Sequence, residues 1–118
     1  MRGLMNNRIS RINQLLKKEI GRILIREIDL AGGLITITRV ETSSNLQEAG
    51  VYISVMPADQ TDRVFKDLDR EIYDIQQSLN KRLKMRPVPK IKFRKEERTR
   101  EAARIEELLE KAKNEEKD

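Results

Sequence analysis

The sequence predicts an α+β fold, a small two-layer sandwich in which two helices pack on one face of a three-stranded sheet. The spacing of apolar residues changes from helical to alternating and back, in the order helix, strand, strand, long helix, strand. With 118 residues, the chain has room for one modest core without disulfides or metals. We therefore expect one domain over residues 1–95 and a charged helical tail over residues 96–118.

The first helix is expected over residues 6–26, because apolar side chains recur at spacings of three and four. This core-facing stripe consists of Ile9, Ile12, Leu16, Ile20 and Ile23. The far side and one flank of the same helix are basic. They carry Arg8, Arg11, Lys18, Arg22 and Arg26.

Two strands should follow the turn at residues 29–33, where glycine can adopt positive φ. Residues 34–42 are rich in β-branched side chains and residues 51–56 alternate in character, both typical of strands. Residues 43–50 form a short polar connection, so the two strands are expected to pair antiparallel. Pro57 ends the second strand.

A long helix is expected next, capped by Asp59 or Thr61. Its apolar stripe runs through Val64, Leu68, Ile72, Ile75, Leu79 and Leu83. Pro87 and Pro89 cannot continue a helix, and a third strand follows at residues 90–94. In that strand Ile91 and Phe93 point one way, and the basic residues between them point the other. The strand should return beside an existing strand by a crossover.

Charge is divided into blocks along the chain. Residues 1–26 carry seven basic groups and one acidic group, and residues 27–74 carry four and ten. Residues 75–95 contain eight basic groups and no acidic one. We expect the fold to bring the two basic blocks together on one wall, which would suit a polyanion such as nucleic acid.

Several other functions are excluded by composition. The chain has no Cys and no His, so it lacks disulfides, thiolate metal sites and the usual general base. The carboxylate pairs Asp67 with Glu71 and Asp59 with Asp62 are interpreted as solvated ion pairs. No signal peptide or membrane span is apparent. We expect a soluble, cytoplasmic, monomeric protein with no cofactor, no metal and no enzymatic activity.

The predicted element order is that of a type II KH domain, a nucleic-acid-binding fold. Three stretches, RISRINQLLKKEIGRIL, LITITRVETSSNLQEAGVYISVM and SLNKRLKMRPVPKIKF, together with the tail RIEELLEKA, resemble the ribosome-binding factor A family over residues 8–112. Two features depart from that family. The chain has DLAGG instead of an Asp-Pro-Arg turn, and Tyr73 stands where the kink in the family's long helix has a glycine.

The resemblance implies a non-enzymatic assembly factor. Such a factor would bind the immature small (30S) ribosomal subunit near the 5′ region of its rRNA and assist 16S rRNA maturation. The residues themselves leave two alternatives open. One is a protein-interaction adaptor acting through Ile105, Leu108 and Leu109 of the tail, and the other is a duplex-DNA binder using the same basic face.

The expected mode of RNA binding is phosphate contact and recognition of shape. The chain has no GxxG loop and few aromatic residues for base stacking. The candidate RNA-binding residues are Arg8, Arg11, Lys18, Arg22, Lys81, Lys84, Arg86, Lys90, Lys92 and Arg94. Structural roles are open to some of these cations as well. Arg86 could bind the last carbonyls of the helix, Arg82 could lie over the core, and the lysines of the third strand could protect a sheet edge.

Overall fold

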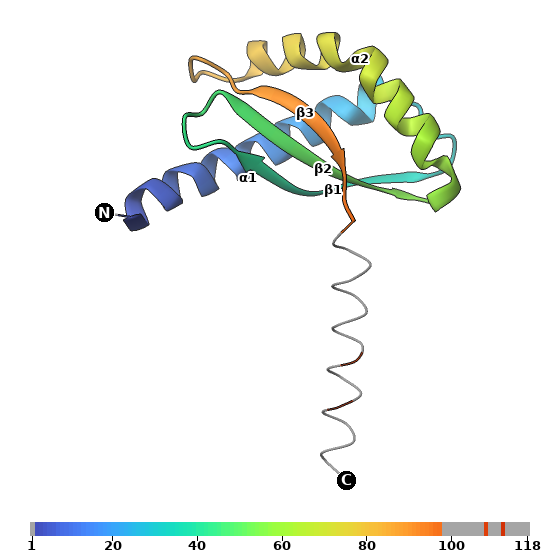
Figure 1. The fold of residues 1–118 in the computed structure, drawn as a ribbon. Helices are drawn as coiled ribbons and strands as arrows, with labels where there is room; N and C mark the ends of the chain where they lie inside the picture. Colours follow the sequence, from blue (N-terminus) through green and yellow to red (C-terminus); the bar gives the residue numbers. More distant parts are fainter. Residues whose placement is uncertain (1, 98–107, 109–111, 113–118) are drawn as a thin grey trace.

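The computed structural model describes residues 2–97, 108 and 112. Its elements follow the predicted order (Figure 1). They are α1 (Arg2–Glu27), β1 (Leu34–Thr42), β2 (Glu48–Met56), the 3-10 helix η1 (Ala58–Gln60), α2 (Thr61–Arg82) and β3 (Lys90–Lys95). Most of the predicted tail lies outside the described residues. Of that tail, Leu108 and Ala112 are helical.

The three strands form one sheet in the order β1-β2-β3. β1 and β2 pair antiparallel, and β3 lies parallel to β2, which confirms the predicted crossover. β2 begins three residues earlier than predicted, because Ala49 pairs with Thr42 and Gly50 with Glu41. Residues 48–50, which were expected in the loop, therefore belong to the hairpin. The register shifts between Ile37 and Arg39.

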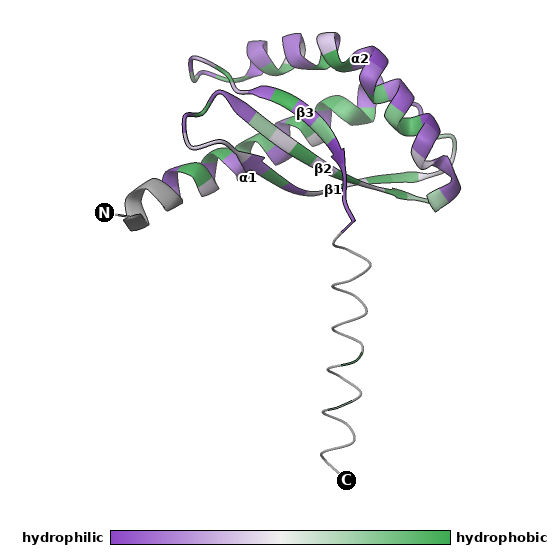
Figure 2. Cartoon of the chain, viewed as in Figure 1, coloured by the Kyte–Doolittle hydropathy of each residue, from purple (hydrophilic) through white to green (hydrophobic). Residues whose placement is uncertain are grey.

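Both helices cover the same face of the sheet, so the predicted two-layer α+β sandwich is confirmed. Hydrophobic and hydrophilic residues alternate along the strands and helices (Figure 2), and the hydrophobic ones meet between the layers. Among the described residues no polar or charged residue is buried. The most deeply buried aliphatic side chains are Leu16, Ile20, Ile23, Val51, Ile53, Val64, Leu68, Ile75, Leu79 and Ile91.

The long helix starts differently from the prediction. Gln60 occupies the N-cap without a side-chain hydrogen bond, so the predicted cap by Asp59 or Thr61 is wrong. The Thr61 hydroxyl donates instead to the Ala58 carbonyl, at 2.7 Å, within the preceding 3-10 turn. α2 is continuous from Thr61 to Arg82, and Figure 1 shows it changing direction near its middle. It bends without Gly or Pro, with Tyr73 exposed on its surface.

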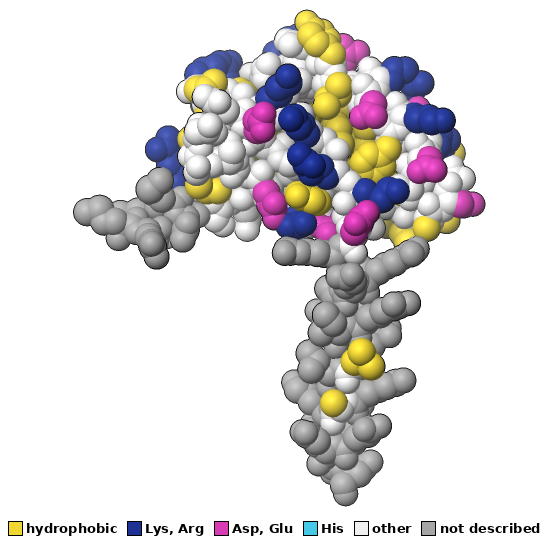
Figure 3. Space-filling view, in the orientation of Figure 1, with side chains coloured by type: hydrophobic (Ala, Val, Ile, Leu, Met, Phe, Trp, Pro, Cys, Tyr) yellow, Lys and Arg dark blue, Asp and Glu magenta, His cyan; other side chains and the backbone are white. Residues whose placement is uncertain are grey.

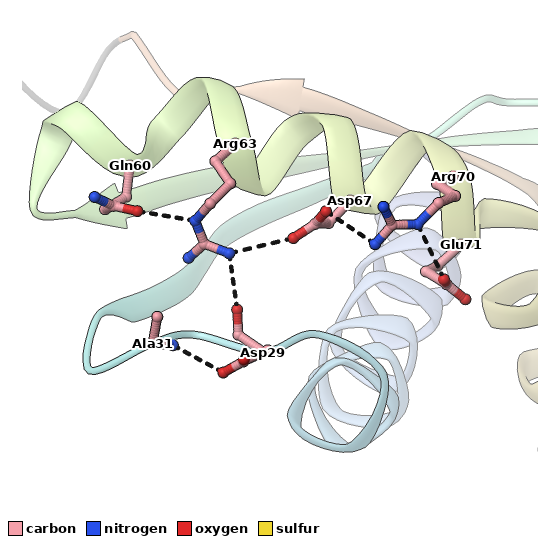
Figure 4. A network of polar contacts seen from close by, with 7 residues as sticks. All are labelled: Asp29, Ala31, Gln60, Arg63, Asp67, Arg70 and Glu71. Carbon is pink, nitrogen blue, oxygen red and sulfur yellow. Dashed lines mark hydrogen bonds and ion pairs between the residues drawn. The ribbon is translucent and has the colours of Figure 1, made fainter.

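Ion pairs along α2 confirm the predicted role of Asp67 and Glu71 (Figure 4). Asp67 lies 3.3 Å from Arg63 and 3.0 Å from Arg70, and Arg70 lies 3.4 Å from Glu71. Arg63 also donates to the Asp29 carbonyl at 3.2 Å. This network ties the first turns of α2 to the loop between α1 and β1.

No helix in the described part of the chain is long and apolar enough to cross a lipid bilayer.

Candidate nucleic-acid interface

The basic residues of β3 lie on the open face of the sheet. Ile91 is buried beneath the helices, so the alternating side chains of Lys90, Lys92 and Arg94 project into solvent on the opposite side. Figure 3 looks onto this open face and shows a row of basic side chains, with acidic side chains beside it. The register sets Lys92 beside Gly50 and Arg94 beside Tyr52.

Carboxylates interrupt this open face. Lys92 Nζ lies 3.8 Å from Glu48 Oε1. Arg39 stacks on Tyr52, with its guanidinium carbon 3.8 Å from the ring centroid. The Arg39 Nε donates to Glu96 Oε2 at 2.8 Å, and its Nη1 pairs with Glu41.

The hydrogen bond from Arg39 to Glu96 raises the pKa of Arg39 above its ordinary value, with a further contribution from the charge of Glu41. The guanidinium is thereby held by two carboxylates. The four basic residues and three acidic residues named here carry a formal charge of only +1 together. Such a mixed surface attracts a polyanion weakly.

The helical layer brings the other candidates together. Arg82, at the end of α2, pairs with Glu19 in the middle of α1 at 3.2 Å. This contact sets the section of the second basic block that lies in α2 beside the first block. Both helices expose their predicted cations in this layer, and so does the loop that follows α2. The exposed residues of this group are Arg8, Arg11, Lys18, Arg22, Lys81 and Lys84.

The expected single basic wall is therefore wrong in part. The first block meets the section of the second block that lies at the end of α2, but the β3 section faces the other way. The physical reason is the alternation of a strand. Burying Ile91 under the helices forces Lys90, Lys92 and Arg94 to the opposite side of the sheet.

Two of the ten candidates already have partners in the helical layer. Arg86 Nη1 donates to the carbonyls of Leu83 at 2.8 Å and Met85 at 2.7 Å, so Arg86 closes the end of α2, the structural role considered for it. Arg22 lies 3.6 Å from Glu19.

The sequence reasoning also missed two cations. Lys17 is exposed beside Lys18, and Arg39 projects from β1. Lys17 could have been found from its position one residue before a candidate. Arg39 could not, because its surroundings depend on the pairing of strands.

Apart from Arg86, eight exposed cations of the helical layer form no ion pair with any residue that the structure describes, and six of them lie in the first two thirds of α1 or around the end of α2. We call these six the helical-layer cations, and they are Arg8, Arg11, Lys17, Lys18, Lys81 and Lys84. Glu19 lies between the two helices, where Arg22 and Arg82 engage it. The helical layer is thus the more strongly basic side of the domain.

Comparisons with known proteins agree with this architecture. The chain matches the family described as ribosome-binding factor A over residues 8–109. It is 37% identical over 116 residues to ribosome-binding factor A of Halothermothrix orenii, covering 96% of this chain and 94% of that protein. It is 36% identical over 112 residues to ribosome-binding factor A of Pseudomonas paraeruginosa, covering 90% and 86%.

Solved structures show the same fold. The crystal structure of ribosome-binding factor A from Thermus thermophilus superimposes with a TM-score of 0.65 at 20% identity, covering 74% of this chain and 93% of that one. A homology model of the Thermus thermophilus protein, fitted into a cryo-EM map of a 30S complex, gives a TM-score of 0.58 at 20% identity over 70% and 88%. From its sequence and its fold, the chain belongs to the ribosome-binding factor A family.

Proposed function

We propose that this protein binds the small (30S) ribosomal subunit through the phosphates of its rRNA and assists 16S rRNA maturation without a catalytic step. Membership in the ribosome-binding factor A family supports this proposal. So does the relative from Thermus thermophilus, which is described in a complex with 30S. The proposed activity belongs to the cytoplasm, where ribosomal subunits mature.

The observation that carries the mechanism is the meeting of both basic blocks on the helical layer. Arg82 and Glu19 join the two helices at 3.2 Å, and the helical-layer cations lie on α1 and around the end of α2 without ion-pair partners among the described residues. Unpaired Lys and Arg side chains can exchange their counterions for phosphates, which is the main source of affinity for nucleic acid. The chain has no GxxG loop, so recognition should depend on the shape of folded RNA.

Co-sedimentation with 30S subunits tests which face binds. One variant combines Lys18→Glu with Lys84→Glu on the helical layer. Its matched control combines Lys90→Glu with Lys92→Glu on the open face of the sheet. Each pair lowers the formal charge by four, from +5 to +1, so a difference between the two must come from position and not from net charge.

We expect the helical-layer variant to leave the pellet and the control to remain in it. The reverse result would assign binding to the sheet face. Full retention of both variants would overturn phosphate contact as the mechanism. The maturation step is tested separately in cells that lack the gene. There, the wild-type gene should remove accumulated 16S precursor, and the helical-layer variant should not.

A further inference from the structure

A groove runs between α1 and the edge strand β1. Two adjoining hollows form it, of about 440 and 580 Å³. The first has an apolar lining that includes Ile25, Leu30 and Ile35, and Lys17 and Lys18 line both hollows. Gly21 also lines the first hollow. The groove therefore combines an apolar floor with basic side chains.

Apolar surface at this groove is exposed to solvent in the described structure. Ile25, which lines the first hollow, is 77% exposed. An apolar groove with basic side chains fits an amphipathic helix whose apolar stripe is accompanied by acidic residues. The charge of the groove thus favours an acidic occupant.

The first residue after β3 contacts two residues that line this groove. Glu96 Oε2 accepts hydrogen bonds from Thr38 Oγ1 and Arg39 Nε, each at 2.8 Å, and the Glu96 amide donates to the Ile53 carbonyl at 3.0 Å. Thr38 and Arg39 also line the second hollow. Twenty-one residues follow Glu97, since the chain runs to residue 118.

The composition of that segment matches the groove. Residues 101–112 contain four Glu, one Arg and one Lys, a formal charge of −2. Its apolar residues recur at helical spacing, and Leu108, which is helical, is 65% exposed. The stripe consists of Ala102, Ile105, Leu108, Leu109 and Ala112. Leu108 is the one large apolar residue of this stripe that the structure describes, and its side chain is not covered by the domain.

The lengths also agree. Four extended residues, 97–100, reach roughly 13 Å, which is more than the roughly 10 Å across β2 and β1 that separates β3 from the groove. A helix over residues 101–112 is roughly 18 Å long, and the stretch of α1 that lines the groove, residues 10–25, is roughly 24 Å long. The tail can therefore lie along the groove without stretching.

We propose that residues 101–112 dock as an amphipathic helix into the α1–β1 groove of their own domain. Leu108 and its neighbours in the stripe would cover Ile25 and Leu30, and the glutamates would approach Lys17 and Lys18. If the helical layer binds rRNA as proposed above, the docked tail covers Lys18 and competes with RNA. That consequence rests on the proposed function, whereas the docking does not.

The absence of cysteine from the chain makes disulfide trapping a clean test. The full chain carrying Ile25→Cys and Ala112→Cys is oxidised at low salt without ribosomes. The matched control carries Tyr73→Cys with the same Ala112→Cys. Tyr73 lies on α2 and is 70% exposed. Intramolecular disulfide should form about tenfold faster in the groove pair, because docking raises the effective concentration of the two thiols.

Adding Leu108→Glu should remove that advantage without unfolding the domain, since the Leu108 side chain is exposed. Equal rates in the two pairs would overturn the docking. Disulfides between two chains would overturn it as well, because the groove would then accept the tail of a second copy. Because no RNA is present, failure here leaves the ribosome proposal to its own test.

Discussion

Replacing Gly33 by Ala should destabilise the domain because there is no room for the added methyl group. A Cβ at Gly33 would lie 2.7 Å from the Met56 carbonyl oxygen and 3.1 Å from the Leu30 carbonyl oxygen. Both neighbours are backbone atoms, and the Gly33 amide already donates to Leu30 at 2.8 Å. Relief therefore requires the loop or the end of β2 to move, at a cost of about 2 kcal/mol of unfolding free energy.

Gly32→Ala is the matched control one residue away. Gly32 has φ of +82°, but a Cβ there has no neighbour within 4 Å. Its left-handed conformation costs about 1 kcal/mol, and restricting the unfolded chain offsets part of that. Urea unfolding followed by circular dichroism gives both free energies. A fall of about 10 °C in Tm should accompany Gly33→Ala. A Gly33→Ala protein as stable as the Gly32→Ala protein would refute the steric reasoning.

Three further outcomes follow from the same structure. Leu68→Ala should cost about 2–5 kcal/mol of unfolding free energy, since Leu68 is fully buried. Tyr73→Ala should change the unfolding free energy by less than about 0.5 kcal/mol, because Tyr73 is exposed. Equal losses of unfolding free energy in urea titrations of the two variants would contradict the assigned burial of these residues. Asp67→Asn should cost about 1 kcal/mol or less, because the two ion pairs it removes are partly exposed, and a larger loss in thermal unfolding would show that the network in Figure 4 is stronger than its exposure suggests. Affinity for 30S should fall about 10³-fold between 50 and 200 mM salt if the six helical-layer cations each contact a phosphate, and a flat salt dependence in a filter-binding assay would count against them.

Much of the fold could be predicted because periodicity reports which face of an element is buried. The stripe of α1 and the alternation of β3 both appear in the structure as predicted, with Leu16, Ile20 and Ile91 in the core. The start of β2 was misplaced, because the pairing of Glu41 with Gly50 depends on the partner strand and not on local composition. The cap of α2 was misplaced because a 3-10 turn precedes the helix.

The candidate interface was predicted less completely than the fold. Each cation could be recognised as exposed from its own element, and all ten candidates are exposed. Their grouping depended on the direction that each element faces after packing. Arg86 was also assigned to binding, although it bonds the carbonyls of Leu83 and Met85. The sequence does not distinguish a basic residue that caps a helix from one that faces solvent, because the difference depends on the path of the chain after the helix.

The sequence by itself determined the order of elements, the apolar faces and the two basic blocks, because these depend on spacing along a single chain. The tertiary structure alone decided that α1 and the end of α2 share a basic surface, joined by Arg82 and Glu19, while the cations of β3 face away from it. It also decided that Glu96 ties the C-terminal segment to Thr38 and Arg39. Contacts between residues more than fifty positions apart follow from packing, and no local pattern in the sequence encodes them.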